Sequence, residues 1–448
     1  MDDMTKGRPL GHLVKYAVPL LLGNLMQLMY NAVDSVIAGR FIGEDALAAE
    51  GIAAPVMNMV ILLVSGITIG AGILMSEAFG AKDMARLRKL NGTTLVLGII
   101  SGSVVAVVGF ILSRSILCLM DTPTSILDST TWYLSITFLG VPFVFIFNSL
   151  SSGLKSVGDS KTPLLFLAFS SILNASLDLV FLGLLGFGII CSAVTTVVAE
   201  IVSAILAFWW MKKKNREISP SLGDMKLEKR TVLAILKYGG PTALQQAVQP
   251  CGKLFIQSAV NSLGVSAIAA FNASSRIDSF ALIPEQGIAA AVATFIAQNR
   301  GGGKKERIMP GFLSGLALEI CYALFIGTVV FFFRDSFVSL FVGGEAAEAV
   351  VREGSKYLYV MSFFYIFPSL TNLTQSFFRG CGKMYVTIAA TFTQIFFRTV
   401  FTFLLSASIG IKGVAFASGI GWAAMLIWEI PYMLLTARRL GFRNGGQR

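Results

Sequence analysis

The feature that most constrains this chain is its succession of long apolar segments joined by short polar ones. Each segment is long enough for the ~20 residues that a helix needs to cross a bilayer. The 448-residue chain is 55% hydrophobic and only 14% charged, whereas soluble proteins carry about 25% charged residues. We therefore predict an all-α polytopic membrane protein with twelve transmembrane helices. The predicted spans are approximately 13–38, 46–76, 92–114, 132–153, 162–184, 189–211, 233–261, 266–298, 310–333, 357–378, 384–409 and 411–437.

The placement of the basic residues predicts how the chain is inserted. Most of the 36 lysine and arginine residues lie in the termini or in the joints after even-numbered spans. By the positive-inside rule, both termini are cytoplasmic. The net charge of +11 therefore reflects membrane topology and not nucleic-acid binding. We expect a multi-pass protein of the cell inner (plasma) membrane that acts as a monomer.

Cysteine and histidine residues offer no metal site. The five cysteines are scattered in apolar surroundings without CxxC spacing, and the single histidine, His12, precedes the first span. We therefore expect packing cysteines, no transition-metal site and no cofactor other than a coupling ion.

An internal repeat divides the chain nearly in half. The segment KYAVP at 15–19 recurs as KYGGP at 237–241, and GEDALAA at 43–49 recurs as GVSAIAA at 264–270. The two copies of each segment are six spans apart, so the halves have the same orientation and are related by an axis along the membrane normal. We predict two pseudo-symmetric six-helix lobes around a central cleft. Their bounds are 1–211 for the N-lobe, 212–232 for a cytoplasmic linker and 233–448 for the C-lobe.

Three polar residues of the first half have apolar counterparts in the second half. Under the repeat, Asp34 aligns with Ile256, Asn174 with Phe396, and Asp178 with Val400. We interpret these polar groups as functional, because the fold does not need a group that its paired half lacks. A carboxylate in hydrocarbon costs at least ~2.5 to 3.5 kcal/mol, so Asp34 must face a protein interior or a water-filled cavity.

Helical spacing places these residues on one face of span 1 and one face of span 5, at a similar depth in the membrane. Asn174 and Asp178 are four residues apart in span 5, and Gln27, Asn31 and Asp34 share a face of span 1. Tyr30 lies four residues before Asp34. Both aspartates lie roughly 9 Å from the outer end of their span, at 1.5 Å per residue. We therefore expect the two carboxylates to meet.

Two carboxylates in a site screened from lipid favour the binding of a proton, through desolvation and like-charge repulsion. The same oxygens, with Asn174, could instead hold Na⁺ at Asp34 and Asp178. A third interpretation is structural, in which Asp34 and Asp178 only satisfy buried Asn and Tyr groups.

The second half has cations within its spans. They are Lys253, Arg276 and Arg398, and the acidic residues in the neighbouring stretch are Asp278 and Glu285. One interpretation is a structural ion network among these residues. The other is that Lys253, Arg276, Glu285 and Arg398 bind a substrate with an anionic part.

Several of these positions together resemble a known transporter family. They are Pro19, Gln27, Tyr30-Asn31, Asp34, Gly39-Arg40 and Leu47-Ala48-Ala49, followed by Asn174, Asp178 and Ala297-Gln298-Asn299. The pattern, which covers nearly the whole chain, resembles the multidrug and toxic compound extrusion (MATE) family of bacterial type.

The resemblance implies a cation-driven antiporter with alternating access, which exports amphipathic drugs or toxic organic compounds. It also implies that Gln27, Tyr30, Asn31 and Asp34 form an N-lobe cation and substrate site with Asn174 and Asp178. Some members carry a carboxylate in span 7, where this chain has Gln249, and another in span 10. A Na⁺ site of that kind in the C-lobe is therefore not expected.

The sequence also bears on three other function classes. An intramembrane aspartyl protease needs a GxGD run, which the sequence lacks, so we do not expect an enzyme. A channel would need a filter-like loop or a charge ring, and we find neither. A flippase for lipids or lipid-linked oligosaccharides shares the two-lobe architecture and a cationic cavity, and it remains the alternative function.

Overall fold

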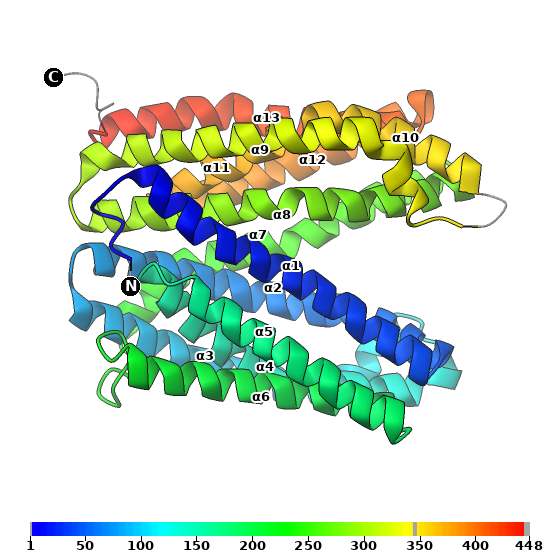
Figure 1. Ribbon diagram of the computed structural model, residues 1–448, viewed down its shortest axis with the longest axis horizontal. Helices are drawn as coiled ribbons and strands as arrows, with labels where there is room; N and C mark the ends of the chain where they lie inside the picture. The colour runs from blue at the N-terminus through cyan, green and yellow to red at the C-terminus, as the bar shows by residue number, and fades with distance from the viewer. Residues whose placement is uncertain (1, 344–346, 443–448) are drawn as a thin grey trace. The chain divides into compact units, whose positions relative to one another are not determined.

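The computed structural model describes residues 2–343 and 347–442. Within these ranges the chain forms α-helices, one short π-helix and no strand, so the all-α prediction is confirmed (Figure 1). The helices of the first half are α1 (Pro9–Phe41), α2 (Glu44–Gly80), α3 (Met84–Leu119), α4 (Thr124–Ser156), α5 (Lys161–Asp178), η1 (Leu179–Leu184) and α6 (Ile189–Lys214). Those of the second half are α7 (Lys229–Asn261), α8 (Val265–Gly301), α9 (Lys305–Ser339), α10 (Ala347–Phe364), α11 (Ile366–Gly380), α12 (Met384–Ile409) and α13 (Ile411–Arg439).

Ten of the predicted spans correspond to one α-helix each, and two are interrupted. Span 5 is α5 continued by the π-helix η1, which begins directly after Asp178. Span 10 consists of α10 and α11, which meet at Tyr365. π-Helical turns are frequent at functional sites, so the change at Asp178 draws attention to this carboxylate.

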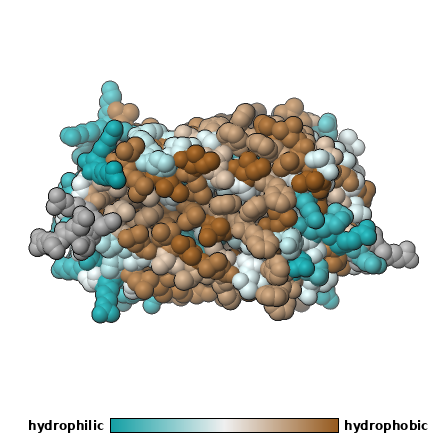
Figure 2. All heavy atoms as spheres, turned by 90° about the horizontal axis from the view of Figure 1, so that it is seen from above, coloured by the Kyte–Doolittle hydropathy of each residue, from teal (hydrophilic) through white to brown (hydrophobic). Residues whose placement is uncertain are grey.

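Among the described residues, nine helices are both long and apolar enough to cross a membrane. The helices outside this group are α1, α7 and the pair α10–α11. Two of them, α1 and α7, are the helices on which sequence analysis placed Asp34 and Lys253. Figure 2 shows one face of the surface, on which apolar side chains form a broad band between hydrophilic ends, as expected of helices that cross a membrane.

The described residues form two compact units. Unit 1 comprises Asp2 and Asp3 together with Leu22–Ala243, and unit 2 comprises Met4–Leu21 and the described residues from Leu244 onward. The helices α1 and α7 therefore each contribute to both units. This division lies elsewhere than the predicted linker at 212–232, and the predicted lobes stay a prediction about the protein in its membrane.

Close helix packing in unit 1 depends on glycines of α3. A Cβ atom on Gly102 would lie 2.9 Å from the Cα atom of Pro142 on α4, and one on Gly109 would lie 2.2 Å from the ring of Phe138. Small residues let helix backbones approach closely within a membrane. Phe138 and Pro142 belong to α4, which carries part of the core of unit 1.

Candidate functional site

Three carboxylates from three helices interact electrostatically in unit 1. Asp34 of α1 interacts electrostatically with Glu50 of α2 and with Asp178 of α5. The residue Asp178 is 0% exposed and Glu50 is 7% exposed, whereas Asp34 is half-buried. We refer to Asp34, Glu50 and Asp178 as the acidic cluster. The structure thus brings together the two aspartates of spans 1 and 5.

The hydrogen bonds around Asp178 leave acceptors free. The hydroxyl of Thr195 on α6 donates to Oδ1 of Asp178, and Nδ2 of Asn174 donates to Oγ1 of Thr196 at 3.3 Å. Oδ2 of Asp178 and Oδ1 of Asn174 are buried and receive no hydrogen bond. Because buried acceptors are rarely left without a partner, these two oxygens are suited to bind a proton or a small cation.

Two tyrosines border the acidic cluster. Tyr30 interacts with Asp34 and Asp178, with Thr196 through its hydroxyl, and with Glu200 of α6. Tyr133 of α4 interacts electrostatically with all three carboxylates of the cluster. Tyrosine hydroxyls can donate to a carboxylate, and they can also pass a proton between neighbouring acids.

Glu200 is a further acid of unit 1, half-buried as a residue but with a buried Oε2 atom. A Cβ atom on Gly140 of α4 would lie 1.9 Å from its Oε2 atom, so the carboxylate fills the space that the missing side chain of Gly140 leaves open. The same Oε2 atom receives no hydrogen bond.

Glu50, Tyr133 and Thr195 were not predicted from the sequence. For Glu50 the signal was available, because the match of GEDALAA to GVSAIAA aligns it with Phe271. The comparison that selected Asp34 would therefore have selected Glu50 too. Thr195 and Tyr133 carry no comparable signal, because hydroxyl groups are ordinary in transmembrane helices.

Gln27 and Asn31, also predicted for the site, are exposed side chains in unit 1. Nε2 of Gln27 donates to Oδ1 of Asn31 at 3.4 Å. Their amides therefore interact with each other one helical turn before Asp34.

In unit 2, two of the three predicted cations share one carboxylate. Asp278 of α8 accepts hydrogen bonds from the hydroxyls of Tyr357 at 3.0 Å and Tyr365 at 2.6 Å. Lys253 and Arg398 both interact electrostatically with Asp278. Nε of Arg398 is buried without a hydrogen-bond partner. We refer to Lys253, Asp278 and Arg398 as the basic cluster, since it holds two cations and one anion.

The other two residues predicted to bind substrate on this side lie apart from the basic cluster. Arg276 is exposed, with its guanidinium 5.9 Å from the ring centroid of Phe341. Glu285 is fully buried and interacts with Glu319 of α9. Helical spacing predicts which residues share a face, but it does not predict these partners from other helices.

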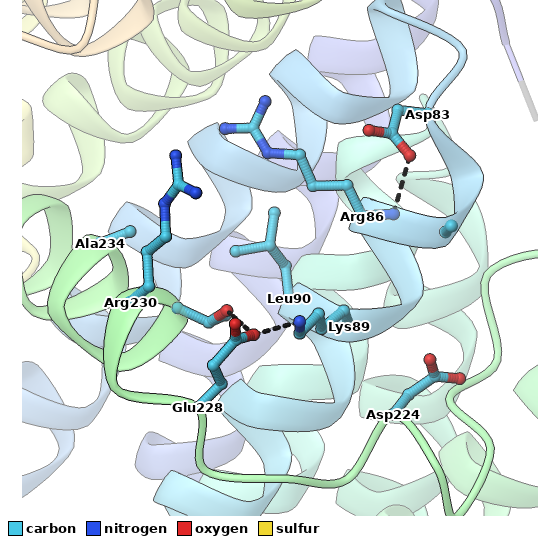
Figure 3. Close-up of a pocket in the computed structure, with 10 residues that line it drawn as sticks. Asp83, Arg86, Lys89, Leu90, Asp224, Glu228, Arg230 and Ala234 are labelled. Carbon is cyan, nitrogen blue, oxygen red and sulfur yellow. Dashed lines mark hydrogen bonds and ion pairs between the residues drawn. The ribbon is translucent and has the colours of Figure 1, made fainter.

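A surface pocket of about 750 Å³ lies in unit 1 between the start of α3 and the segment before α7 (Figure 3). Asp83 accepts the main-chain N–H of Arg86 at 2.9 Å and caps α3, and Lys89 pairs with Glu228. The hydrogen bond from Lys89 is the largest cause that lowers the pKa of the Glu228 carboxyl. Figure 3 shows Arg230, at the start of α7, across the pocket from Arg86 of α3.

The same segment is held along α3 by further bonds. Nδ2 of Asn91 donates to the carbonyl of Ile218 at 3.1 Å, and Oγ1 of Thr93 donates to the carbonyl of Lys226 at 3.0 Å. These bonds and the Lys89–Glu228 pair fix the polar segment after α6, so we interpret the pocket as part of a structural anchor.

No cluster of three or more His, Cys, Asp or Glu residues is placed to hold a metal ion in the ranges that the structure describes. Na⁺ also accepts amide and hydroxyl oxygens, so the predicted Na⁺ site at Asp34, Asn174 and Asp178 stays a prediction.

The chain is similar to known transporters over most of its length. The MatE family model matches residues 19–180 and 241–404. The probable multidrug resistance protein YpnP of Bacillus subtilis is 30% identical over 423 residues, which is 94% of each chain. The probable multidrug resistance protein NorM of Thermotoga maritima is 23% identical over 94% of this chain and 91% of that one.

The fold has a close match among solved structures. A structure described as the outward-facing conformation of a multidrug resistance MATE family transporter of the MOP superfamily superposes with a TM-score of 0.91, at 21% identity over 98% of each chain. Because the family model matches both halves and YpnP is similar over nearly the full length, the chain belongs to the MatE family, the MATE transporters that its sequence resembles.

Proposed function

We propose that this protein is a secondary active antiporter that exports amphipathic organic compounds in exchange for protons. The curated relatives are named multidrug resistance proteins, which supports drug efflux. The observation that carries the coupling proposal is the acidic cluster, in which Asp34, Glu50 and Asp178 meet and Oδ2 of Asp178 has no hydrogen-bond partner.

The charges of the acidic cluster favour a coupling cation. Among the described residues, no lysine or arginine has an electrostatic interaction with any of the three carboxylates. Buried ions that lack a partner of opposite charge cost several kcal/mol each, so the cluster takes up positive charge. A proton meets this need with no further ligand, whereas Na⁺ would recruit the oxygens of Asn174. We propose H⁺, with Na⁺ as the alternative coupling ion.

Exchange of protons for substrate follows from this assignment, and we propose that it operates by alternating access. When a proton leaves the cluster, the cluster regains negative charge and can attract a cationic or amphipathic compound. When a proton returns, that attraction is lost and the compound is released. We propose that the exchange takes place in a monomer of the cell inner membrane whose two termini are cytoplasmic.

The decisive experiment measures efflux in proteoliposomes that contain the purified protein. Asp34→Asn should abolish ion-coupled efflux while folding and insertion stay normal. The matched control is Asp128→Asn, since Asp128 is 80% exposed and pairs with Arg114 at 2.6 Å. Wild-type efflux by Asp34→Asn would contradict the proposal.

The coupling ion is identified in the same preparation by imposing one gradient at a time. Efflux driven by a proton gradient in Na⁺-free buffer is the expected result. Efflux driven only by a Na⁺ gradient would assign Na⁺ to the acidic cluster. Flip of a lipid probe without drug efflux would favour the flippase, an alternative that the names of the relatives do not support.

The basic cluster supports a proposal about substrate charge. Two cations around the single carboxylate of Asp278 leave a net positive charge, and Nε of Arg398 has no partner. We propose that Lys253 and Arg398 attract anionic or zwitterionic groups of a substrate. Lys253→Met and Arg398→Leu should therefore weaken efflux of anionic compounds more than efflux of lipophilic cations. Equal losses for both classes would make the basic cluster a structural ion network.

A further inference from the structure

A second group of buried carboxylates lies in unit 2, away from the basic cluster. Glu285 belongs to α8 and Glu319 to α9, and both residues are 0% exposed. The two carboxylates interact electrostatically. The helices α8, α9 and α11 pack against one another. The pair therefore lies in the interior of unit 2.

The hydrogen-bonding groups around this pair are incompletely used. Nδ2 of Asn372 on α11 donates to Oε2 of Glu285 at 3.5 Å. Oε1 of Glu285 and both carboxylate oxygens of Glu319 are buried without a hydrogen bond of ordinary geometry. The hydroxyl of Ser369, which is also 0% exposed, lies within hydrogen-bonding reach of both carboxylates. One hydroxyl can donate to only one of these three buried acceptors at a time.

No positive charge compensates the pair within the described chain. The other titratable groups that interact electrostatically with it are two tyrosines, Tyr322 of α9 and Tyr365 between α10 and α11. The hydroxyl of Tyr322 already donates to the carbonyl of Ala281 at 2.7 Å, and that of Tyr365 donates to Asp278. Two ionised carboxylates without a partner are strongly disfavoured in a protein interior. The site therefore requires at least one added positive charge.

The internal repeat argues that the fold does not need these acids. Residues 66–86 also recur as residues 287–307, with small residues in common and a closing glycine and basic cluster. The same offset aligns Glu285 with Val64 and Glu319 with Gly98. At these positions the paired helices of unit 1 carry a valine and a glycine, so neither has a polar side chain there. Two glutamates that are costly to bury and absent from the paired half point to a role beyond packing.

We propose that Glu285 and Glu319 form a second proton-binding site in unit 2, in which Ser369 and Asn372 donate hydrogen bonds to the carboxylate that remains ionised. One proton is held between the two acids and exchanges with solvent. This inference goes beyond the proposed antiport and does not depend on it, because the site can be loaded whether or not the acidic cluster couples transport.

The test is infrared spectroscopy of the purified full-length protein, titrated across neutral pH in Na⁺-free buffer without substrate. Glu285→Gln and Glu319→Gln, measured separately, should each remove the absorption of one protonated carboxyl that titrates in the wild-type protein. The matched control is Glu353→Gln. Glu353 lies in the same unit, but its side chain is 25% exposed and pairs with Lys356 at 2.6 Å, so its replacement should leave this absorption unchanged.

Three results would overturn the proposal. The absorption is unchanged in both glutamine variants, it is present but does not titrate, or it disappears at neutral pH when Na⁺ is added to the wild-type protein. Thermal unfolding of each variant verifies folding, and if one variant is unfolded the other decides. Repeating the titration with Asp34→Asn separates this site from the acidic cluster, since the absorption should persist there even if transport is lost.

Discussion

Replacement of Arg307 by alanine should release residues 4–7, the N-terminal segment, from the end of α8 within unit 2. In the structure, Nη2 of Arg307 donates to the carbonyls of Gly7 at 2.8 Å, Lys6 at 3.1 Å and Met4 at 3.3 Å. Its Nε donates to Oδ1 of Asn299 at 3.1 Å. One side chain thus holds the main chain of residues 4–7 against the end of α8.

The magnitude follows from the three bonds between Arg307 and this segment. The bonds to Lys6 and Gly7 are exposed, so we assign about 0.5 kcal/mol to each, the lower end of the usual range. The bond to Met4 is partly buried, and about 1 kcal/mol is appropriate. Their sum of about 2 kcal/mol corresponds to a roughly 30-fold larger population of the released segment, since 1.4 kcal/mol is tenfold. The bond to Asn299 orients the guanidinium but does not reach the segment, so it is not counted.

The assay is amide hydrogen exchange followed by mass spectrometry, with the peptide that contains residues 4–8 as the readout. Exchange in Arg307→Ala should be roughly 30-fold faster than in the wild-type protein under conditions where exchange follows local opening. Arg307→Lys keeps the charge but loses the planar fork of donors, so it should give an intermediate rate. Lys305→Ala, at an exposed neighbouring position, is the control. Unchanged exchange in Arg307→Ala would refute the reasoning.

Two further predictions concern stability. Gly311→Ala should destabilise the protein by about 1–3 kcal/mol, measured by thermal unfolding in detergent, because its Cβ atom would lie 2.1 Å from the ring of Phe295; an unchanged midpoint would contradict this. The pKa of Glu228 is lowered by Lys89 from the ordinary 4.5, so its contribution is complete above pH 4.5 and is lost as pH falls through the lowered pKa. Limited proteolysis of residues 215–228 should increase over that range in the wild-type protein and depend less on pH in Lys89→Ala.

The number and type of spans could be predicted because bilayer thickness fixes the length of an apolar helix. The break in span 10 was harder to predict, since α10 and α11 together have the length of one helix. Pro368 is the third residue of α11, and without an N–H it cannot donate to the carbonyl of Phe364, the last residue of α10. Pro19, Pro142 and Pro284 lie within continuous helices, so proline alone does not identify the break.

The motif Ala297-Gln298-Asn299 shows a different limit of sequence reasoning. It contributed to the resemblance to the MATE family, but the sequence did not say what its polar groups contact. In unit 2, Oε1 of Gln298 accepts the main-chain N–H of Met4 at 3.0 Å, and Nδ2 of Asn299 donates to the Met4 carbonyl at 3.2 Å. The motif therefore binds a segment almost 300 residues earlier in the chain, a contact that no local pattern predicts.

The comparison of the two halves proved the most informative step, and it works in both directions. Taken from the first half, it selects Asp34, Asn174 and Asp178, and it would have added Glu50. Taken from the second half, it selects Glu285 and Glu319, whose counterparts have no polar side chain. The sequence argument assigned coupling to one lobe because Gln249 replaces a carboxylate found in other members of the family. That substitution removes one acid from span 7, but it does not bear on acids carried by α8 and α9. Because each half carries buried carboxylates that its partner lacks, proton binding need not follow the symmetry of the fold, and the acids of each unit have to be tested separately.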